Sequence, residues 1–113
     1  MSDDCLFCRI ASGAIPAKLV AQSDDCVAFR DIDPKAPVHV LVIPRKHVPS
    51  LDALEDPMLL ARIATMASEV ARAEGIASSG YRTVINTGPD AGQSVAHLHM
   101  HVLGGRRMSW PPG

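Results

Sequence analysis

The sequence predicts one compact domain that combines several β-strands with one long helix. Its 113 residues, 47% of them hydrophobic, suffice for a single core but not for two. Short runs rich in β-branched residues recur between turn-forming residues, as expected for strands. One later segment instead repeats its apolar residues every three or four positions, as expected for a helix. Because neither an internal repeat nor a linker is evident, residues 1–113 are predicted to form one domain.

The first half of the chain is predicted to contain a short helix and three strands. In order, these elements cover residues 5–12 for the helix and 18–22, 26–30 and 38–43 for the strands. The third strand is the clearest, since it is almost continuously apolar and Pro44 closes it. His39 interrupts this run, either as a hydrogen-bonded core residue or as a side chain that points into a functional site.

The long helix is predicted to begin at Asp56 and Pro57. Aspartate can cap the first free amide groups, and proline suits the first helical position because its missing N–H is not needed there. The apolar positions form one buried stripe: Leu59, Ile63, Met66 and Val70. The charged positions face solvent: Arg62, Glu69 and Arg72. Gly75 ends the helix, and a strand over residues 81–87 follows.

The last predicted strand, residues 97–103, carries His97, His99 and His101 at every second position. Since successive side chains of a strand point to opposite faces, the histidines share one face and the intervening apolar residues line the core. At about 3.3 Å per residue, the outer two histidines lie about 13 Å apart. One metal ion therefore cannot bind all three, although two of them could converge on zinc. Hydrogen-bonded core histidines are the simpler alternative.

A glycine-rich loop, residues 88–94, directly precedes the histidine strand. Such a loop can hold an anion through its backbone N–H groups and the Ser94 hydroxyl. It also suits an ordinary connection between two strands. Asn86, just before the loop, either orients a phosphate or ribose oxygen or simply ends the preceding strand.

The histidine row suggests nucleophilic chemistry. An imidazole can attack phosphorus or a carbonyl carbon and form a covalent intermediate, provided that neighbours hold its tautomer and stabilise developing charge. His99 has a histidine on each side and is the predicted nucleophile. His101 is predicted to donate to the phosphoryl oxygens or to the leaving group. Asp31 either binds a sugar hydroxyl or is a solvated turn residue.

The charge balance limits the classes of partner. The chain has eleven basic and twelve acidic residues and no extended basic cluster. Nucleic acid is therefore not an expected partner. No apolar run approaches the roughly 20 residues that span a bilayer, and no export signal is evident. We therefore expect a soluble, cytoplasmic protein with no membrane partner.

The three cysteines, an odd number without an export signal, argue against a disulfide framework. Cys5 and Cys8 form a Cys-x-x-Cys pair, which could be a redox pair, half of a zinc site, or two ordinary buried thiols. Cys26 stands alone in an apolar stretch and is expected to be a small core residue.

Residues 93–103 resemble the signature of the histidine triad, or HIT, superfamily, in which three histidines alternate with apolar residues. Further matches to the family are spread along the chain: Ile15-Pro16-Ala17, Phe29, Asp31-Ile32, Pro37 through Pro44, His47 and Asn86-Thr87-Gly88. The ending Gly104-Gly105-Arg106-Arg107-Met108 and Trp110-Pro111-Pro112-Gly113 resembles the Hint branch in particular. The resemblance covers nearly the whole chain.

This resemblance implies a two-layer α+β fold, with an antiparallel sheet of about five strands and one long helix packed on it. It implies a homodimer joined through that helix and a strand. It also implies a purine nucleoside phosphoramidase: His99 attacks the α-phosphorus of an adenosine 5′-phosphoramidate, the amine leaves, and water then releases AMP. No organic cofactor is expected. The alternative is a nucleotide-binding scaffold protein with residual hydrolase activity.

The resemblance also assigns roles to individual residues. The base would contact Ile32, Phe7, Ile10, Phe29 and Leu41. Ribose and phosphate would contact Asp31, Asn86, Gly92, Gln93, Ser94, His99 and His101. The catalytic group would be His39, Ser94, His99 and His101, with His39 assisting proton movement near the leaving group. Trp110 would reach the site of the partner subunit.

A zinc site is implied in the same way. Several bacterial relatives, and the related uridylyltransferases, bind structural zinc through a Cys-x-x-Cys pair and two histidines. By that pattern the ligands here would be Cys5, Cys8, His47 and His97. Two thiolates and two imidazoles suit a closed tetrahedral site, whereas a catalytic site would keep an open position. A metallohydrolase with catalytic zinc on two of the triad histidines is the competing hypothesis.

Overall fold

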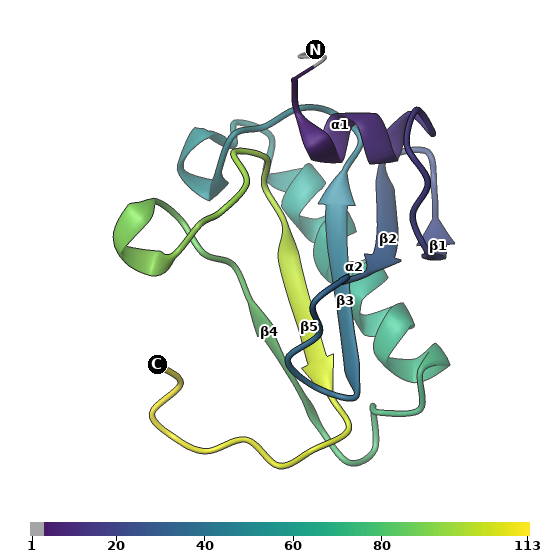
Figure 1. Cartoon of the computed structure of the whole chain (residues 1–113), viewed down its shortest axis with the longest axis vertical. Helices are drawn as coiled ribbons and strands as arrows, with labels where there is room; N and C mark the ends of the chain where they lie inside the picture. Colours follow the sequence, from purple (N-terminus) through teal and green to yellow (C-terminus); the bar gives the residue numbers. More distant parts are fainter. Residues whose placement is uncertain (1–3) are drawn as a thin grey trace.

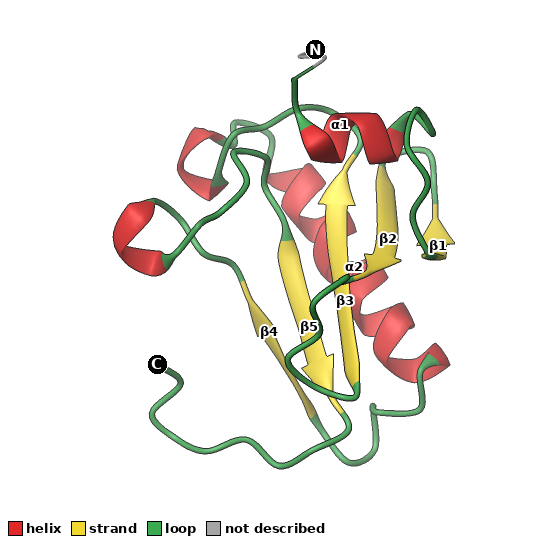
Figure 2. Ribbon diagram, viewed as in Figure 1, coloured by secondary structure: helices red, strands yellow, loops and turns green. Residues whose placement is uncertain are grey.

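The computed structural model describes residues 4–113. A five-stranded antiparallel sheet forms one layer, and helix α2 packs on one of its faces as the second layer (Figures 1 and 2). The elements in chain order are α1 (Leu6–Ala11), β1 (Leu19–Gln22), β2 (Cys26–Arg30), β3 (Val38–Pro44), η1 (Leu51–Ala53), α2 (Pro57–Ala73), β4 (Tyr81–Val84), η2 (Pro89–Ala91) and β5 (Met100–Gly104). This architecture confirms the predicted α+β class, whereas the homodimer stays a prediction.

The order of strands brings histidines from distant parts of the chain together. The strand order is β1-β2-β3-β5-β4, so the last strand lies between two earlier ones. Its antiparallel pairing with β3 places Leu103 opposite His39 and His101 opposite Leu41. Residues that are directly opposite, or two apart, share a face of the sheet. His39 and His101 therefore occupy diagonal positions on one face.

Helix α2 begins as its sequence predicts. The Oδ1 atom of Asp56 accepts a hydrogen bond from the Met58 N–H at 3.0 Å, and Pro57 is the first helical residue. The predicted apolar stripe is buried against the sheet, and the three predicted charged positions are exposed. At about 25 cal/mol per Å² of apolar surface, this stripe supplies much of the hydrophobic stabilisation. None of the helices within residues 4–113 is long and apolar enough to cross a bilayer.

A second, smaller core lies on the face of the sheet that α2 leaves uncovered. Helix α1 crosses one end of that face (Figure 1). The members of this core come from α1, β2 and β3: Phe7, Val27, Phe29, Leu41 and Ile43. They alternate along each strand with residues of the main core, such as Ala28 and Val42. Both faces of β2 and β3 are therefore buried, which explains their nearly continuous apolar sequence.

The histidine strand is shorter than predicted. Strand β5 begins at Met100, so His97 and His99 lie in the irregular segment before it. If the register between β3 and β5 continued, Leu98 would lie opposite Pro44. Proline has no N–H to donate to the ladder, so the pairing ends there. Strand β4 likewise ends three residues earlier than predicted.

The segment before β5 nevertheless keeps the predicted alternation on its core side. The Leu98 N–H donates to the carbonyl of Val48 at 2.7 Å, which replaces the missing ladder bond. Leu98, Met100 and Val102 all enter the main core against α2. The intervening histidines are thus directed to the opposite side of the chain.

Candidate active site and metal centre

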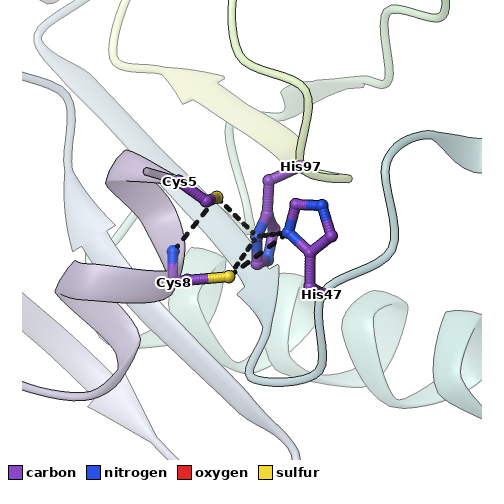
Figure 3. A group of neighbouring side chains, drawn as sticks. All are labelled: Cys5, Cys8, His47 and His97. Carbon is purple, nitrogen blue, oxygen red and sulfur yellow. Dashed lines mark hydrogen bonds between the residues drawn. The ribbon is translucent and has the colours of Figure 1, made fainter. Parts of the chain in front are cut away.

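Four side chains from three segments meet in what we call the Cys/His cluster: Cys5, Cys8, His47 and His97 (Figure 3). Cys5 precedes α1 and Cys8 lies within it, whereas His47 follows β3 and His97 precedes β5. One possible ligand atom from each residue lies within 4.8 Å of the others. The fold thus brings together all four side chains that the family resemblance associates with zinc.

The spacing of these donor atoms matches a tetrahedron around a zinc ion. The Nδ1 atoms of His47 and His97 are 3.3 Å apart. The Cys8 Sγ atom lies 3.2 Å from the first and 3.5 Å from the second. Bonds of about 2.0–2.1 Å to nitrogen and about 2.3 Å to sulfur give tetrahedron edges of about 3.3 Å and about 3.6 Å. The four side chains therefore fit a closed zinc site.

Hydrogen bonding determines which nitrogen of His97 faces the cluster. The carbonyl oxygen of Pro44 lies 2.8 Å from Nε2 of this fully buried ring. A carbonyl only accepts, so Nε2 donates and Nδ1 keeps its lone pair. That lone pair faces Cys5 Sγ, Cys8 Sγ and His47 Nδ1 at 3.3–3.5 Å. One in-plane lone pair accepts a single directional hydrogen bond, whereas a cation satisfies all four donors together.

The ring of His99 is oriented through its other nitrogen. Its Nδ1–H donates to the carbonyl of His97 at 2.7 Å, which leaves a lone pair on Nε2 of the neutral ring. The ring is buried and packs edge-on against Phe7, with centroids 5.1 Å apart. A held imidazole with a free basic nitrogen is what nucleophilic attack requires.

A chain of hydrogen bonds leads from the β2–β3 loop to His101. The backbone N–H of Lys35 donates to His39 Nδ1 at 3.0 Å, so the proton of neutral His39 lies on Nε2. His39 Nε2 donates to His101 Nδ1 at 2.9 Å, which places the remaining proton of His101 on its own Nε2. His101 thereby offers an N–H beside His99, at a ring separation of 5.1 Å. We call His39, His99 and His101 the histidine cluster.

Burial keeps the rings of His39 and His101 neutral. It lowers the pKa of His39, and together with repulsion from His99 and His39 it lowers the pKa of His101 to about 4. The Asp31 carboxylate, with Oδ2 3.5 Å from His39 Nε2, acts in the opposite direction. At neutral pH these two rings are uncharged, so the tautomers inferred from the hydrogen bonds hold.

The loop before the histidines is held together by Gln93. Its Oε1 accepts from the Gly88 N–H at 3.0 Å, and its Nε2 donates to the carbonyls of Pro49 at 2.8 Å and Val95 at 3.0 Å. Sequence reasoning assigned Gln93 to ribose and phosphate and missed these bonds. No local pattern signals the bond to Pro49, which lies 44 positions away. Ser94, in the same loop, is exposed to solvent.

The apolar residues predicted to contact a base differ widely in exposure. Three of them are almost fully buried in the smaller core: Phe7, Phe29 and Leu41. Ile10 packs against this core and is half-buried. Ile32 is fully exposed, and Trp110 in the C-terminal segment is 81% exposed. The fold therefore gathers the first group in the smaller core between α1 and the sheet and leaves Ile32 and Trp110 in solvent.

Among the predicted polar contacts, Asp31 lies beside the histidine cluster. Asp31 uses Oδ1 to accept from the Asp33 N–H at 2.8 Å and directs Oδ2 toward His39. Asn86 is half-buried just after β4, and Gly92 is exposed with a left-handed backbone, φ 81°. That conformation favours glycine, so Gly92 is required for the turn itself.

The sheet-and-helix fold and the two sets of histidines define a small α+β domain with a histidine-rich site. The model of the HIT domain family matches residues 12–108, and the chain belongs to that family. Uncharacterized HIT-like proteins of Synechococcus elongatus and Synechocystis are 49% and 50% identical over 115 residues, and all of both chains is covered.

Solved structures agree with this assignment. A HIT family hydrolase from Legionella pneumophila is 49% identical, with a TM-score of 0.94 over 97% of this chain and 100% of that one. A histidine triad protein from Clostridium difficile is 39% identical, with a TM-score of 0.93 over 96% of each chain. The chain thus has the fold of HIT family hydrolases.

Proposed function

We propose that this protein is a hydrolase of the Hint type, which cleaves the P–N bond of purine nucleoside 5′-phosphoramidates, such as those of adenosine, and releases AMP. The observation that carries the proposal is the complementary state of two neighbouring rings: His99 offers a lone pair and His101 an N–H. Nucleotidyl transfer needs a nucleophile beside a donor for the phosphoryl group. The Legionella relative, described as a hydrolase, supports the same reaction class.

In the first step, His99 Nε2 attacks the α-phosphorus and forms an N–P bond while the bond to the leaving nitrogen breaks. The electron pair of the broken bond stays on the leaving nitrogen, which takes a proton from His101 Nε2 and departs as an amine. His39 passes its Nε2 proton to His101 Nδ1 across their 2.9 Å hydrogen bond and takes a proton from solvent in exchange, so that neither ring is left as an anion. The product of this step is an adenylyl group on His99.

In the second step, water attacks the phosphorus and the N–P bond breaks. Its electron pair returns to His99 Nε2, and the proton lost by water enters the His39–His101 pair at His101 Nε2 while the proton taken from solvent in the first step is released. AMP is released and the starting tautomers are restored. Each histidine therefore ends the cycle in the state in which the hydrogen bonds hold it.

Exposed groups around the histidine cluster support a nucleotide as the ligand. We assign ribose to Asp31, whose carboxylate lies 3.5 Å from His39, and the base to the fully exposed Ile32 beside it. We assign the phosphate to Ser94 and Gly92 in the loop before the histidines, together with Asn86.

We further propose that the Cys/His cluster holds one structural zinc ion. The donor spacing and the lone pair of His97 support this proposal. With zinc bound, the four ligands would tie α1 to the segments that follow β3 and precede β5. Neither of the two candidate donor groups among the described residues contains two triad histidines, which argues against catalytic zinc on the triad.

We propose a homodimer joined through α2 and the edge strand β4. Strand β4 lies at the outer edge of the sheet, and edges of this kind readily pair with a second chain. The exposed Trp110 is then available to reach the site of the partner subunit.

Mass spectrometry of the protein, quenched while it turns over an adenosine phosphoramidate, tests the proposed reaction. We expect an added adenylyl group that maps to His99 and is absent from His99→Ala. An adenylyl group on another residue would contradict the assigned nucleophile. Complete turnover without any covalent intermediate would contradict the mechanism as a whole.

A further inference from the structure

We propose that Arg106 is a positioning residue for the histidine cluster, because it holds the backbone segment that fixes the tautomers of His39 and His101. This inference rests on the proposed function, in which His101 gives its Nε2 proton to the leaving group. It adds a residue that lies outside both clusters and acts on them through a backbone carbonyl.

The segment after β5 passes close to the β2–β3 loop, residues 31–37. Strand β5 ends opposite Val38, the first residue of β3, so the chain leaves the sheet beside that loop (Figure 1). Gly105 has φ +89°, and a Cβ atom at this position would lie 2.9 Å from the Cβ atom of Pro37. Glycine suits both the backbone conformation and the close approach. The turn places Arg106 next to the loop.

Arg106 holds the loop by a single carbonyl group. Its Nε–H and one Nη2–H both donate to the carbonyl oxygen of Lys35, at 3.1 and 3.0 Å. Hydrogen bonds from a charged donor are roughly twice as strong as those between neutral groups. The other hydrogen bonds described for this loop, within residues 4–113, join it to itself or to His39. Arg106 therefore ties the loop to a separate segment of the chain.

Lys35 passes the effect of Arg106 to His39, because its own N–H donates to His39 Nδ1 at 3.0 Å. The N–H and the carbonyl of one residue are joined through a single Cα atom. Two backbone dihedral angles therefore determine how the two groups are directed relative to each other. When Arg106 holds the carbonyl, the N–H stays directed at the ring.

The Lys35 N–H decides the direction of the hydrogen bond between His39 and His101. The 2.9 Å separation of His39 Nε2 and His101 Nδ1 allows either nitrogen to donate. Without the Lys35 donor, His39 would be able to carry its proton on Nδ1 and to accept from His101 through Nε2. His101 Nε2 would then hold a lone pair and have no proton for a leaving group.

A second group favours the same tautomer of His39. The Asp31 carboxylate lies 3.5 Å from His39 Nε2 and attracts a proton to that nitrogen. This distance is longer than the 3.0 Å between the Lys35 nitrogen and His39 Nδ1. We therefore expect the loss of Arg106 to shift the tautomers in part and not to reverse them.

Nitrogen-15 NMR of the histidine rings in the ligand-free full chain tests the proposal, because it shows which ring nitrogen carries the proton. In the wild type, His39 and His101 should carry it on Nε2. Arg106→Met keeps an apolar stem but loses every side-chain N–H. In this variant, the signals of both rings should move toward those of the Nδ1–H form.

Arg107→Met is the matched control. It removes the same charge one residue later, from an exposed guanidinium that makes no hydrogen bond or ion pair within residues 4–113. This variant should leave the signals of both histidine rings unchanged. Arg106→Gln serves as a second variant if Arg106→Met does not fold.

Turnover of an adenosine phosphoramidate gives the second readout. The kcat of Arg106→Met should fall about tenfold, the effect of losing one hydrogen bond from a charged group. The KM should change little, because the tautomers affect proton transfer and not the binding of the substrate. Arg107→Met should keep the kcat of the wild type.

Three results would overturn the proposal. The ring signals could stay unchanged in Arg106→Met, or the Tm alone could fall, which would make Arg106 a purely structural contact. Arg107→Met could also have the same effect as Arg106→Met, which would make charge alone responsible. Because the NMR measurement needs no substrate, it tests this proposal even if the protein does not hydrolyse phosphoramidates.

Discussion

His97 and His99 stand two residues apart and are both held by a backbone carbonyl, but through opposite nitrogens. His97 donates from Nε2 to Pro44 and leaves Nδ1 with a lone pair. His99 donates from Nδ1 to His97 and leaves Nε2 with a lone pair. The first lone pair points among two thiols and a second imidazole, and the second remains available to a substrate. In the proposed function, one residue type thus serves as a metal donor in one position and as a nucleophile in the other.

The Cys/His cluster around His97 and the histidine cluster around His99 differ in a corresponding way. In the Cys/His cluster, four donors converge within 4.8 Å around one point. In the histidine cluster, a directed chain of hydrogen bonds runs from the Lys35 N–H through His39 to His101, whose ring lies beside that of His99. Convergent lone pairs suit a cation, whereas a directed chain suits proton transfer. Variants that affect one cluster and spare the other test this contrast.

The largest expected effect is that of His99→Ala on turnover. Removing the nucleophile should lower the hydrolysis rate by about 10⁴-fold or more. Binding of AMP, measured by calorimetry, should persist because the remaining contacts are intact. Zinc content, measured by atomic absorption, should be unchanged. Full turnover in this variant would show that the free lone pair is not the reacting group.

The next largest effect is expected from Cys8→Ser, now on stability. Loss of one thiolate should abolish zinc binding and lower the Tm on the order of 10 °C, since each 1 kcal/mol moves the Tm of a domain of this size by several degrees. Cys26→Ala is the control, because this buried thiol has its pKa raised to about 11 by burial and stands apart from the cluster. Equal zinc content in Cys8→Ser and wild type would refute the metal assignment.

A smaller effect on rate is expected from His39→Gln. The glutamine amide still donates to His101 Nδ1 but cannot replace the proton that His101 gives up. The kcat should fall about 10²-fold, the usual range for one proton-transfer group, while the KM and the Tm change little. His39→Leu removes the hydrogen-bond donor as well, so its kcat should fall further. If both variants retain the wild-type kcat, His39 does not take part in proton transfer.

The smallest expected effect is on the pH dependence of stability. Burial lowers the pKa of His101 from its ordinary 6.5 to about 4, so the unfolded chain binds a proton that the folded chain excludes in this interval. The free energy of unfolding should therefore be at its full value above about pH 6.5 and should fall as the pH drops toward 4. His101→Asn should show a shallower decline in denaturant titrations. Identical slopes for the two proteins would contradict the lowered pKa.

Much of the fold could be predicted from local patterns. The cap and the apolar stripe of α2 depend on residues only a few positions apart. Both can therefore be recognised in the sequence between Asp56 and Val70. The early end of the histidine strand was missed because it depends on Pro44, which would face Leu98 across the sheet. The proline was recognised as the end of its own strand, but its effect on a strand that comes more than 50 positions later requires the register.

The candidate site was predictable in its residues but not in its hydrogen bonds. The spacing of the histidines and the family resemblance brought out the members of both clusters. The tautomers depend on backbone groups from other segments, namely the carbonyl of Pro44 and the N–H of Lys35. The hydrogen bond of Gln93 to Pro49 was missed for the same reason, since Pro49 belongs to a distant loop, while its contact with ribose and phosphate stays a prediction. A motif can predict which residues form a site, but it does not predict which ring nitrogen of a histidine carries the proton.

His97 belongs to both sites at once, because its side chain enters the Cys/His cluster while its carbonyl holds the ring of His99. A change in the Cys/His cluster that moves the backbone of His97 would also rotate the ring of His99, the proposed nucleophile. An activity-based mutational scan would therefore rank His97 with the reacting residues, although its imidazole lies with the two thiols. A substitution that displaces His97 would therefore affect both sites, and a redesign of either one must keep His97 in place.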